Sequence, residues 1–127
     1  MRNITLAVIQ DLIKDDCLAL SATQKRLCVP IINRIYKKMS AGIKFSGIKV
    51  SGTLIGDGHH RYIASVFAQA DLDRIPTFMP SATEAVDWSS VIFDEEDWDT
   101  PAKIKMLNQQ DANYNDMPFE KIVSLLV

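Results

Sequence analysis

Apolar residues at four-residue intervals predict a helix in the first third of the chain. The positions that share this face are Leu27, Ile31, Ile35 and Met39. Charged residues lie off the face, and Gly42 just beyond it is a typical helix stop. Pro30 either occupies the first turn or kinks a longer helix that begins near Ala22. We therefore predict a helix over residues 27–39.

Farther along, the apolar pattern changes from a strand period to a helical one. Over residues 43–55 apolar and polar residues alternate around Ser51-Gly52, which predicts two short strands joined by a tight turn. After residues 56–58, apolar residues return at helical spacing, at Ile63, Val66, Phe67 and Ala70. Residues 56–61 are therefore predicted to lie at a strand-to-helix junction.

Less regular patterns predict three further elements. Residues 3–20 fit both periods, and we expect a short strand followed by a turn or helix near Asp11. Residues 75–79 form a strand pattern in which Pro76 indicates a sheet edge or a strand start. Ser81 and Glu84 have capping-box spacing, which predicts a short helix that runs toward Trp88.

The C-terminal third predicts a loop and two helices. Adjacent like charges over residues 94–97 favour a loop. Thr100 and Pro101 are suited to the cap and first position of a helix that runs through about Gln110. A last helix is expected from near Pro118 to the C-terminus.

Composition indicates one globular domain. The chain has 127 residues, of which 47% are hydrophobic and 24% charged, enough to build one buried core. We predict an α/β (α+β) fold, a small mixed sheet with flanking helices, in a single domain over residues 1–127. Its core spans about residues 27–80, and an acidic helical part spans about residues 81–127. Cys17 and Cys28 are expected to be free, buried thiols.

Charge divides the chain into a basic and an acidic part. Residues 1–83 hold eleven Lys and Arg against six Asp and Glu, whereas residues 84–127 hold three against ten. Such a division fits an anion-binding half beside an acidic half that meets a basic protein partner, or two solvated faces. Five cations are candidates for a nucleic-acid contact or for ordinary solvated surface: Lys25, Arg26, Arg34, Lys37 and Lys38. Because no apolar run approaches about 20 residues, we expect a cytoplasmic protein with no membrane partner.

The strand-to-helix junction carries the residue types of a phosphate site. In order they are Gly56, Asp57, Gly58, His59, His60 and Arg61. Both glycines permit positive φ and close backbone approach, and the helix that follows offers amides at its positive end. The arginine can hold phosphate oxygens bidentately, and either histidine can donate a hydrogen bond or move a proton. The aspartate can orient a histidine, hold hydrated Mg²⁺ or act as a base. The alternative is a plain glycine turn, an aspartate cap and two surface histidines.

This segment resembles the central motif of the ParB/sulfiredoxin superfamily. The matching parts are Ile48-Lys49-Val50, Leu54 to Ala64 and Arg74-Ile75-Pro76, and the resemblance covers roughly residues 27–80. It implies a small α/β fold whose loop binds the phosphates of a nucleotide such as ATP, ADP or CTP, usually with Mg²⁺.

The resemblance also assigns roles by position. Phosphate contacts fall at Gly56, Gly58, His59, His60 and Arg61, and the catalytic candidates are Asp57, His59 and His60. His59 stands where sulfiredoxin has its catalytic cysteine, which argues against sulfinic-acid reduction. The free serine kinases of the superfamily use an N-terminal glutamate, but this chain has no glutamate before Glu84. Three aspartates are possible substitutes, namely Asp11, Asp15 and Asp16.

Three functions fit these observations. The first is Mg²⁺-dependent phosphoryl transfer or nucleotide hydrolysis, the second is a ParB-like nuclease of effector or toxin type acting on DNA or RNA, and the third is nucleotide sensing without turnover. In the nuclease, His59 or His60 would be the general base and Arg61 would stabilise the pentavalent phosphate. We expect His60→Ala and Arg61→Ala to abolish phosphate binding and to leave the fold intact, because both residues are expected on an exposed loop.

Overall fold

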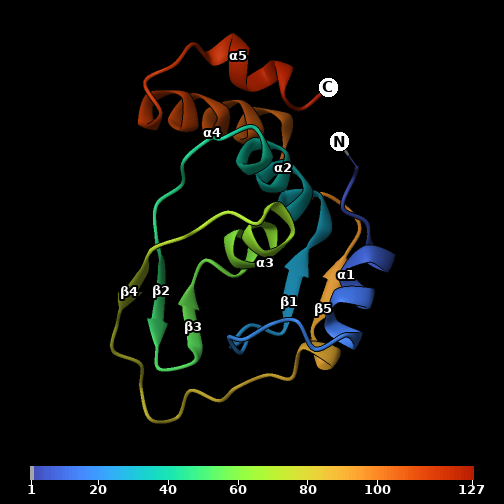
Figure 1. The fold of residues 1–127 in the computed structure, drawn as a ribbon, viewed down its shortest axis with the longest axis vertical. Coiled ribbons are helices and arrows are strands. Elements are labelled where there is room, and N and C mark those ends of the chain that lie inside the picture. Colours follow the sequence, from blue (N-terminus) through green and yellow to red (C-terminus); the bar gives the residue numbers. More distant parts are fainter. Residues whose placement is uncertain (1) are drawn as a thin grey trace.

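The computed structural model describes residues 2–127 as a mixed α/β fold with two small sheets. Figure 1 shows α3 between the sheets, and α4 and α5 at one end of the molecule, beyond α2. The helices are α1 (Leu6–Lys14), α2 (Val29–Ser40), α3 (His59–Ala68), α4 (Pro101–Tyr114) and α5 (Phe119–Ser124), with a 3₁₀ turn η1 (Trp88–Ser90). The strands are β1 (Arg26–Cys28), β2 (Ile48–Ser51), β3 (Leu54–Asp57), β4 (Arg74–Pro76) and β5 (Ile92–Asp94).

The first sheet confirms the predicted strand pair and edge strand. Its order is β3-β2-β4, with β2 antiparallel to β3 and parallel to β4. Gly52 has φ 59° in the turn between β2 and β3, a backbone conformation that glycine adopts at little cost. Pro76 ends the edge strand β4 opposite Val50, where its missing N–H is tolerated. The mixed sheet leads directly into the predicted junction before α3.

The second sheet was not predicted. Strands β1 and β5 pair in parallel, with Leu27 opposite Phe93. Both of these side chains are buried, so Leu27 belongs to a strand and the predicted helix begins two residues later, at Val29. Pro30 lies in the first turn of α2, which settles its role there in favour of a helix start.

Two predicted elements are wrong. The short strand predicted early in residues 3–20 is absent, whereas the helix predicted near Asp11 is confirmed: α1 begins at Leu6, where the Thr5 hydroxyl accepts a hydrogen bond from the Val8 amide at 3.4 Å. The capping-box helix after Ser81 is absent, because that segment is an irregular chain up to η1. Its backbone is engaged across the molecule, since the Val86 amide donates to the carbonyl of Ala22 at 2.8 Å. Tertiary pairing here overrides the local signal.

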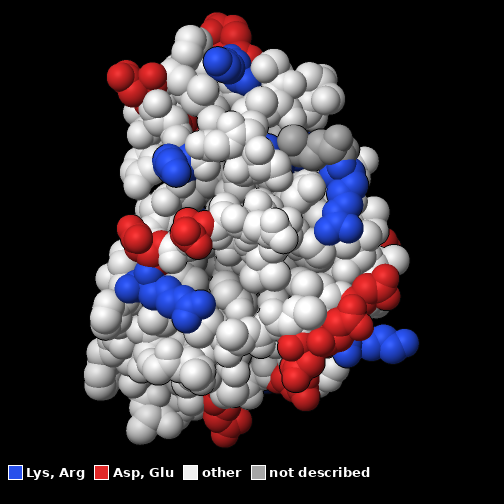
Figure 2. Space-filling model, viewed as in Figure 1, with Lys and Arg blue, Asp and Glu red and all other residues white. Residues whose placement is uncertain are grey.

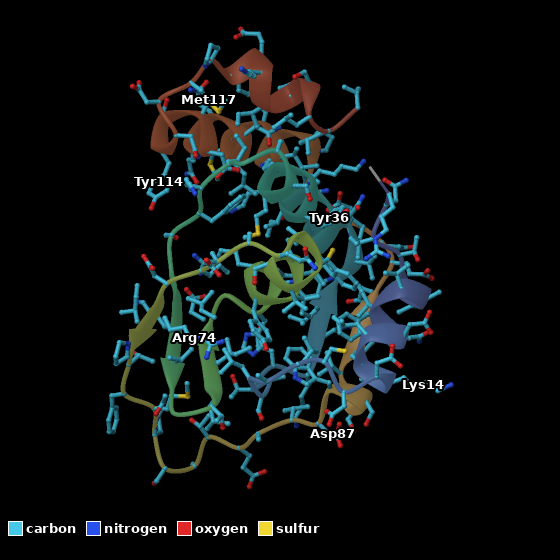
Figure 3. All side chains as sticks on the ribbon, viewed as in Figure 1. Lys14, Tyr36, Arg74, Asp87, Tyr114 and Met117 are labelled. Atoms are coloured by element: carbon cyan, nitrogen blue, oxygen red, sulfur yellow. The ribbon has the colours of Figure 1, made fainter. Side chains whose placement is uncertain are left out.

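The C-terminal helices confirm the prediction and form a hairpin of their own. Thr100 caps α4, and α5 follows Pro118. The hairpin has a small separate core in which Ile122 and Ala112 are buried against Ile43. Figure 3 shows Met117 at the turn between the two helices. This hairpin is a layer added to the end of α2, and it forms one wall of the site described below.

Most of the remaining apolar residues form a single main core. Its largest fully buried side chains include Leu27, Ile32, Ile55 and Ile63, which join β1, α2, β3 and α3. Cys28 is buried as predicted, whereas Cys17 is exposed, contrary to the prediction; both are free. No helix in residues 2–127 is long and apolar enough to cross a membrane.

Candidate functional site

A cavity of about 630 Å³ lies where the start of α3 faces α2 and α4. Its lining includes Asp57, Gly58, His59, His60 and Arg61 from the predicted junction. The structure therefore brings together five of the six predicted residues. The sixth, Gly56, lies outside this lining and contributes to a smaller hollow beside β4.

The start of α3, whose first residues line this cavity, has no side-chain cap. Gly58 is the N-cap residue, and no side chain caps the helix. The first helical hydrogen bond runs from the Tyr62 amide to the carbonyl of Gly58 at 2.8 Å. The amides of His59, His60 and Arg61 precede that bond and have no partner within the helix. With no acidic residue in the first turn, these amides are suited to an anion.

The two glycines of the junction differ in backbone conformation but are both closely packed. Gly58 has φ 103°, and a Cβ at this position would lie 2.5 Å from Cγ2 of Ile48. The positive φ and close approach predicted for Gly58 are both confirmed. Gly56 does not have positive φ, so that part of its prediction is wrong, but it is closely approached: a Cβ there would lie 3.0 Å from Cε of Met79.

His59 is 2% exposed and is held by the backbone of another segment. Its Nε2 accepts a hydrogen bond from the Thr23 amide at 3.0 Å, and its ring meets Trp88 edge-on. Burial lowers the pKa of His59 to about 4, while the negative charge of Asp57 acts in the opposite direction. The ring is therefore neutral at pH 7.

His60 is held in the same way. Its Nε2 accepts a hydrogen bond from the Cys28 amide at 3.0 Å, and its ring meets Trp98 edge-on with centroids 5.4 Å apart. Burial and, to a smaller extent, neighbouring His59 lower its pKa, Asp99 acts in the opposite direction, and the resulting pKa is about 4.

The hydrogen bonds fix the tautomer of both histidines. Because a backbone N–H donates to each Nε2, the proton of each neutral ring lies on Nδ1. Each ring therefore has one donor left and no free basic Nε2. The expectation that His60 lies on an exposed loop is wrong, because His60 is in α3 and only partly exposed.

Arg61 is also less exposed than predicted, because its guanidinium hydrogen-bonds to the chain just before β2. Nη1 donates to the carbonyl and hydroxyl oxygens of Ser46 at 3.0 and 2.6 Å and to the carbonyl of Gly47 at 3.3 Å. Nη2 lies 3.3 Å from Oδ2 of Asp57. The Arg61 side chain is 19% exposed, whereas that of Asp57 is 69% exposed. Arg61→Ala would therefore loosen the sheet as well as the site, which corrects the expectation of an intact fold.

The opposite wall of the cavity contains residues that the sequence analysis did not assign to the site. Arg34 pairs with Asp97 and, at 3.0 Å, with Asp99. Lys38 pairs with Asp111 at 2.6 Å. Lys103 also lines the cavity and has no ion pair within residues 2–127. Lys103 and Asp111 lie eight residues apart on α4, about two helical turns, and this spacing is the sequence signal that would have placed them on one face.

Ion pairs of this kind involve three of the five cations that are candidates for a nucleic-acid contact, called the basic stripe here: Lys25, Arg26, Arg34, Lys37 and Lys38. Of its five cations, Arg26, Arg34 and Lys38 are bound to carboxylates from the acidic part of the chain. Figure 2 shows basic and acidic groups scattered over this face, some of them next to each other, amid neutral surface. Folding therefore brings part of the acidic segment against part of the basic one.

Metal ligation by protein side chains alone is not supported. Within residues 2–127 there is no group of three or more His, Cys, Asp or Glu residues placed to hold an ion.

No family model, curated protein or solved structure matches this chain.

Proposed function

We propose that this protein binds a nucleotide through its phosphates at the start of α3, in a fold of the ParB/sulfiredoxin type. The uncapped amides of His59, His60 and Arg61, which face a cavity of about 630 Å³, carry the proposal. Helix N-termini of this kind bind phosphate because their amides and the helix dipole act together.

The side chains around these amides suit a polyphosphate. Each histidine ring has an Nδ1–H donor, and Arg61 has donors left at Nε and Nη2 besides its contacts with Ser46, Gly47 and Asp57. Lys103 supplies a cation without a carboxylate partner in the described chain. Neutral donors and a few cations bind a charged phosphate without placing excess positive charge in the free site.

Mg²⁺ fits this site as a companion of the phosphates. The ion is usually held by one or two carboxylates together with phosphate oxygens and water, and Asp57 is a cavity carboxylate with a largely exposed side chain. When bound, Mg²⁺ would neutralise charge on the phosphates.

Phosphoryl transfer or nucleotide hydrolysis is the activity we assign. A water or acceptor hydroxyl attacks the terminal phosphorus, the bond from phosphorus to the bridging oxygen breaks, and the nucleotide leaves with one phosphate fewer. The engaged Nε2 atoms remove His59 and His60 as bases at that nitrogen, so we assign them to phosphate orientation. Asp57 remains as the group that accepts the proton or holds the hydrated ion.

Nucleotide sensing without turnover is the second candidate. The observation that favours it is the same engagement of both Nε2 atoms, which leaves the site rich in donors and poor in free bases. The nuclease hypothesis has less support, because three cations of the proposed nucleic-acid contact are already paired.

Calorimetric titration with Mg²⁺ complexes of ATP, ADP and CTP tests the proposal, together with an assay for released phosphate. We expect saturable binding of at least one nucleotide, and turnover that Asp57→Asn removes while binding persists. Asp71→Asn is the matched control, because Asp71 is exposed and outside the cavity. Binding without turnover in the unmodified protein would favour the sensor, and no binding of any nucleotide would contradict the proposal.

A further inference from the structure

Asn108 is a buried polar residue with an unmet hydrogen bond. It lies on α4, lines the cavity and is only 4% exposed. Its Oδ1 atom is buried and has no hydrogen-bond partner among the described residues. Leaving a buried acceptor unpaired destabilises a folded protein. A turn of the carboxamide about χ2 would bring this oxygen to the cavity, where a ligand that donates to it would remove that cost.

The neighbourhood of Asn108 differs from the α3 end of the cavity. Apolar side chains line it from both helices, including Ile35 of α2 and Ile104 and Leu107 of α4. Two cations of this wall are matched: Lys38, itself 4% exposed, pairs with Asp111, and Arg34 pairs with Asp97 and Asp99. The third, Lys103, has no ion pair among the described residues, and the carboxylates of this wall balance its charge overall. The α2–α4 end is therefore apolar and nearly neutral, with a few fixed polar groups.

A phosphate does not fit this end. Its oxygens are acceptors, and an acceptor cannot satisfy the unpaired Oδ1 of Asn108. The carboxylate of Asp111 would also repel it, because Asp111 already neutralises Lys38. The ligand group at this end must instead be largely apolar, planar enough to lie between aliphatic side chains, and able to donate a hydrogen bond.

We propose that the α2–α4 end of the cavity holds the nucleobase, with its edge hydrogen-bonded to the carboxamide of Asn108. This inference rests on the proposed function. A carboxamide has a donor and an acceptor side by side, and nucleobase edges present the same combination. The aliphatic side chains of Ile35, Ile104 and Leu107 would cover the faces of the base. The nucleotide then spans the cavity, with phosphates at α3 and the base at α4.

Comparison of tripolyphosphate with the four ribonucleoside triphosphates, each with Mg²⁺, separates the two ends in the unmodified protein. We expect at least one triphosphate to bind about tenfold or more tightly than tripolyphosphate. Equal binding of tripolyphosphate and all four nucleotides would overturn the base site and leave the phosphate site standing. Failure of tripolyphosphate and all nucleotides to bind would overturn the proposed function and this inference together.

Asn108→Leu tests the residue itself, because leucine has nearly the same shape without the polar atoms. We expect this variant to lose the preference for the nucleotide, to keep its affinity for tripolyphosphate and to melt at a higher temperature when free. Asn113→Leu, the same change at an exposed position of α4, should leave the preference intact. An undiminished preference in Asn108→Leu, or in Asn108→Ala if the first variant does not fold, would contradict the assignment.

Discussion

The histidines at the start of α3 each use one ring nitrogen for the fold and have the other left for a ligand. His59 Nε2 joins α3 to the segment at Thr23, and His60 Nε2 joins it to the start of α2 at Cys28. Both bonds need an unprotonated Nε2. Structure and proposed phosphate contact therefore depend on the same neutral tautomer.

The stability of the protein should fall as the pH is lowered from 6.5 toward 4. Both folded-state pKa values are lowered to about 4 from 6.5, so in this range the unfolded chain binds more protons than the folded one and unfolding becomes easier. The loss is at most about 1.4 kcal/mol per histidine for each unit of pKa shift. Urea unfolding at a series of pH values, with imidazole titration by NMR, measures it. Titration of either folded-state ring near pH 6.5 would contradict the account.

Gly58→Ala should destabilise the protein more than Gly42→Ala. Both glycines have strongly positive φ, but a Cβ at Gly58 meets Ile48, whereas one at Gly42 meets no atom within 4 Å. We expect a loss of about 1–2 kcal/mol for Gly42→Ala from backbone strain alone, and about 2–4 kcal/mol for Gly58→Ala from strain plus overpacking. Chemical denaturation of both variants provides the comparison. Equal losses would show that the contact with Ile48 carries no energy.

At the scale of elements, Arg34 joins α2 to the loop that leads into α4. It binds Asp97 and Asp99 from a side chain that is largely buried, whereas Arg26 binds Asp94 from an exposed one. The loop positions Trp98 against His60 and α4 against the cavity. The acidic segment is thus structural, which the sequence pattern did not indicate.

Arg34→Gln should release this loop and cost about 1–3 kcal/mol, as expected for lost hydrogen bonds to charged groups. Amide hydrogen exchange over residues 95–104 should become faster, and unfolding should be easier. Arg26→Gln is the control and should change exchange there little, because surface ion pairs contribute little. Equal effects of the two changes would contradict the role given to Arg34.

Elements with a complete local signal could be predicted from the sequence, and elements made by distant pairing could not. The helix after Leu27, the β2–β3 hairpin and the Thr100 cap each have their spacing and their start or stop residues within one segment. Strand β5 has only three residues and exists because Leu27 meets Phe93, far away in the sequence. The same holds for the candidate site. The junction at residues 56–61 could be recognised because it is one continuous motif, whereas Asn108 could not, because it comes from another helix.

At the scale of the whole molecule, folding pairs several cations of the first part of the chain with carboxylates of the acidic part. The basic stripe and the acidic part meet across α2, β5 and the loop before α4. Long-range attraction to nucleic acid depends on unpaired cations in one continuous region. The folded protein is therefore better suited to a small anion in its cavity than to a nucleic-acid backbone.

Binding to nucleic acid should be weak under physiological salt. In fluorescence anisotropy with labelled single- and double-stranded oligonucleotides, we expect a dissociation constant above about 100 μM, the weak limit of non-specific binding. Affinity in the micromolar range with a steep salt dependence would instead restore the nuclease hypothesis.

The most direct test of phosphate binding at α3 is a backbone amide NMR titration of the full chain with Mg²⁺ tripolyphosphate. We predict that the largest shifts fall on the amides of His59, His60 and Arg61, which have no partner within the helix. Saturable shifts that bypass these three amides, or no shifts at saturating ligand, would contradict the central claim.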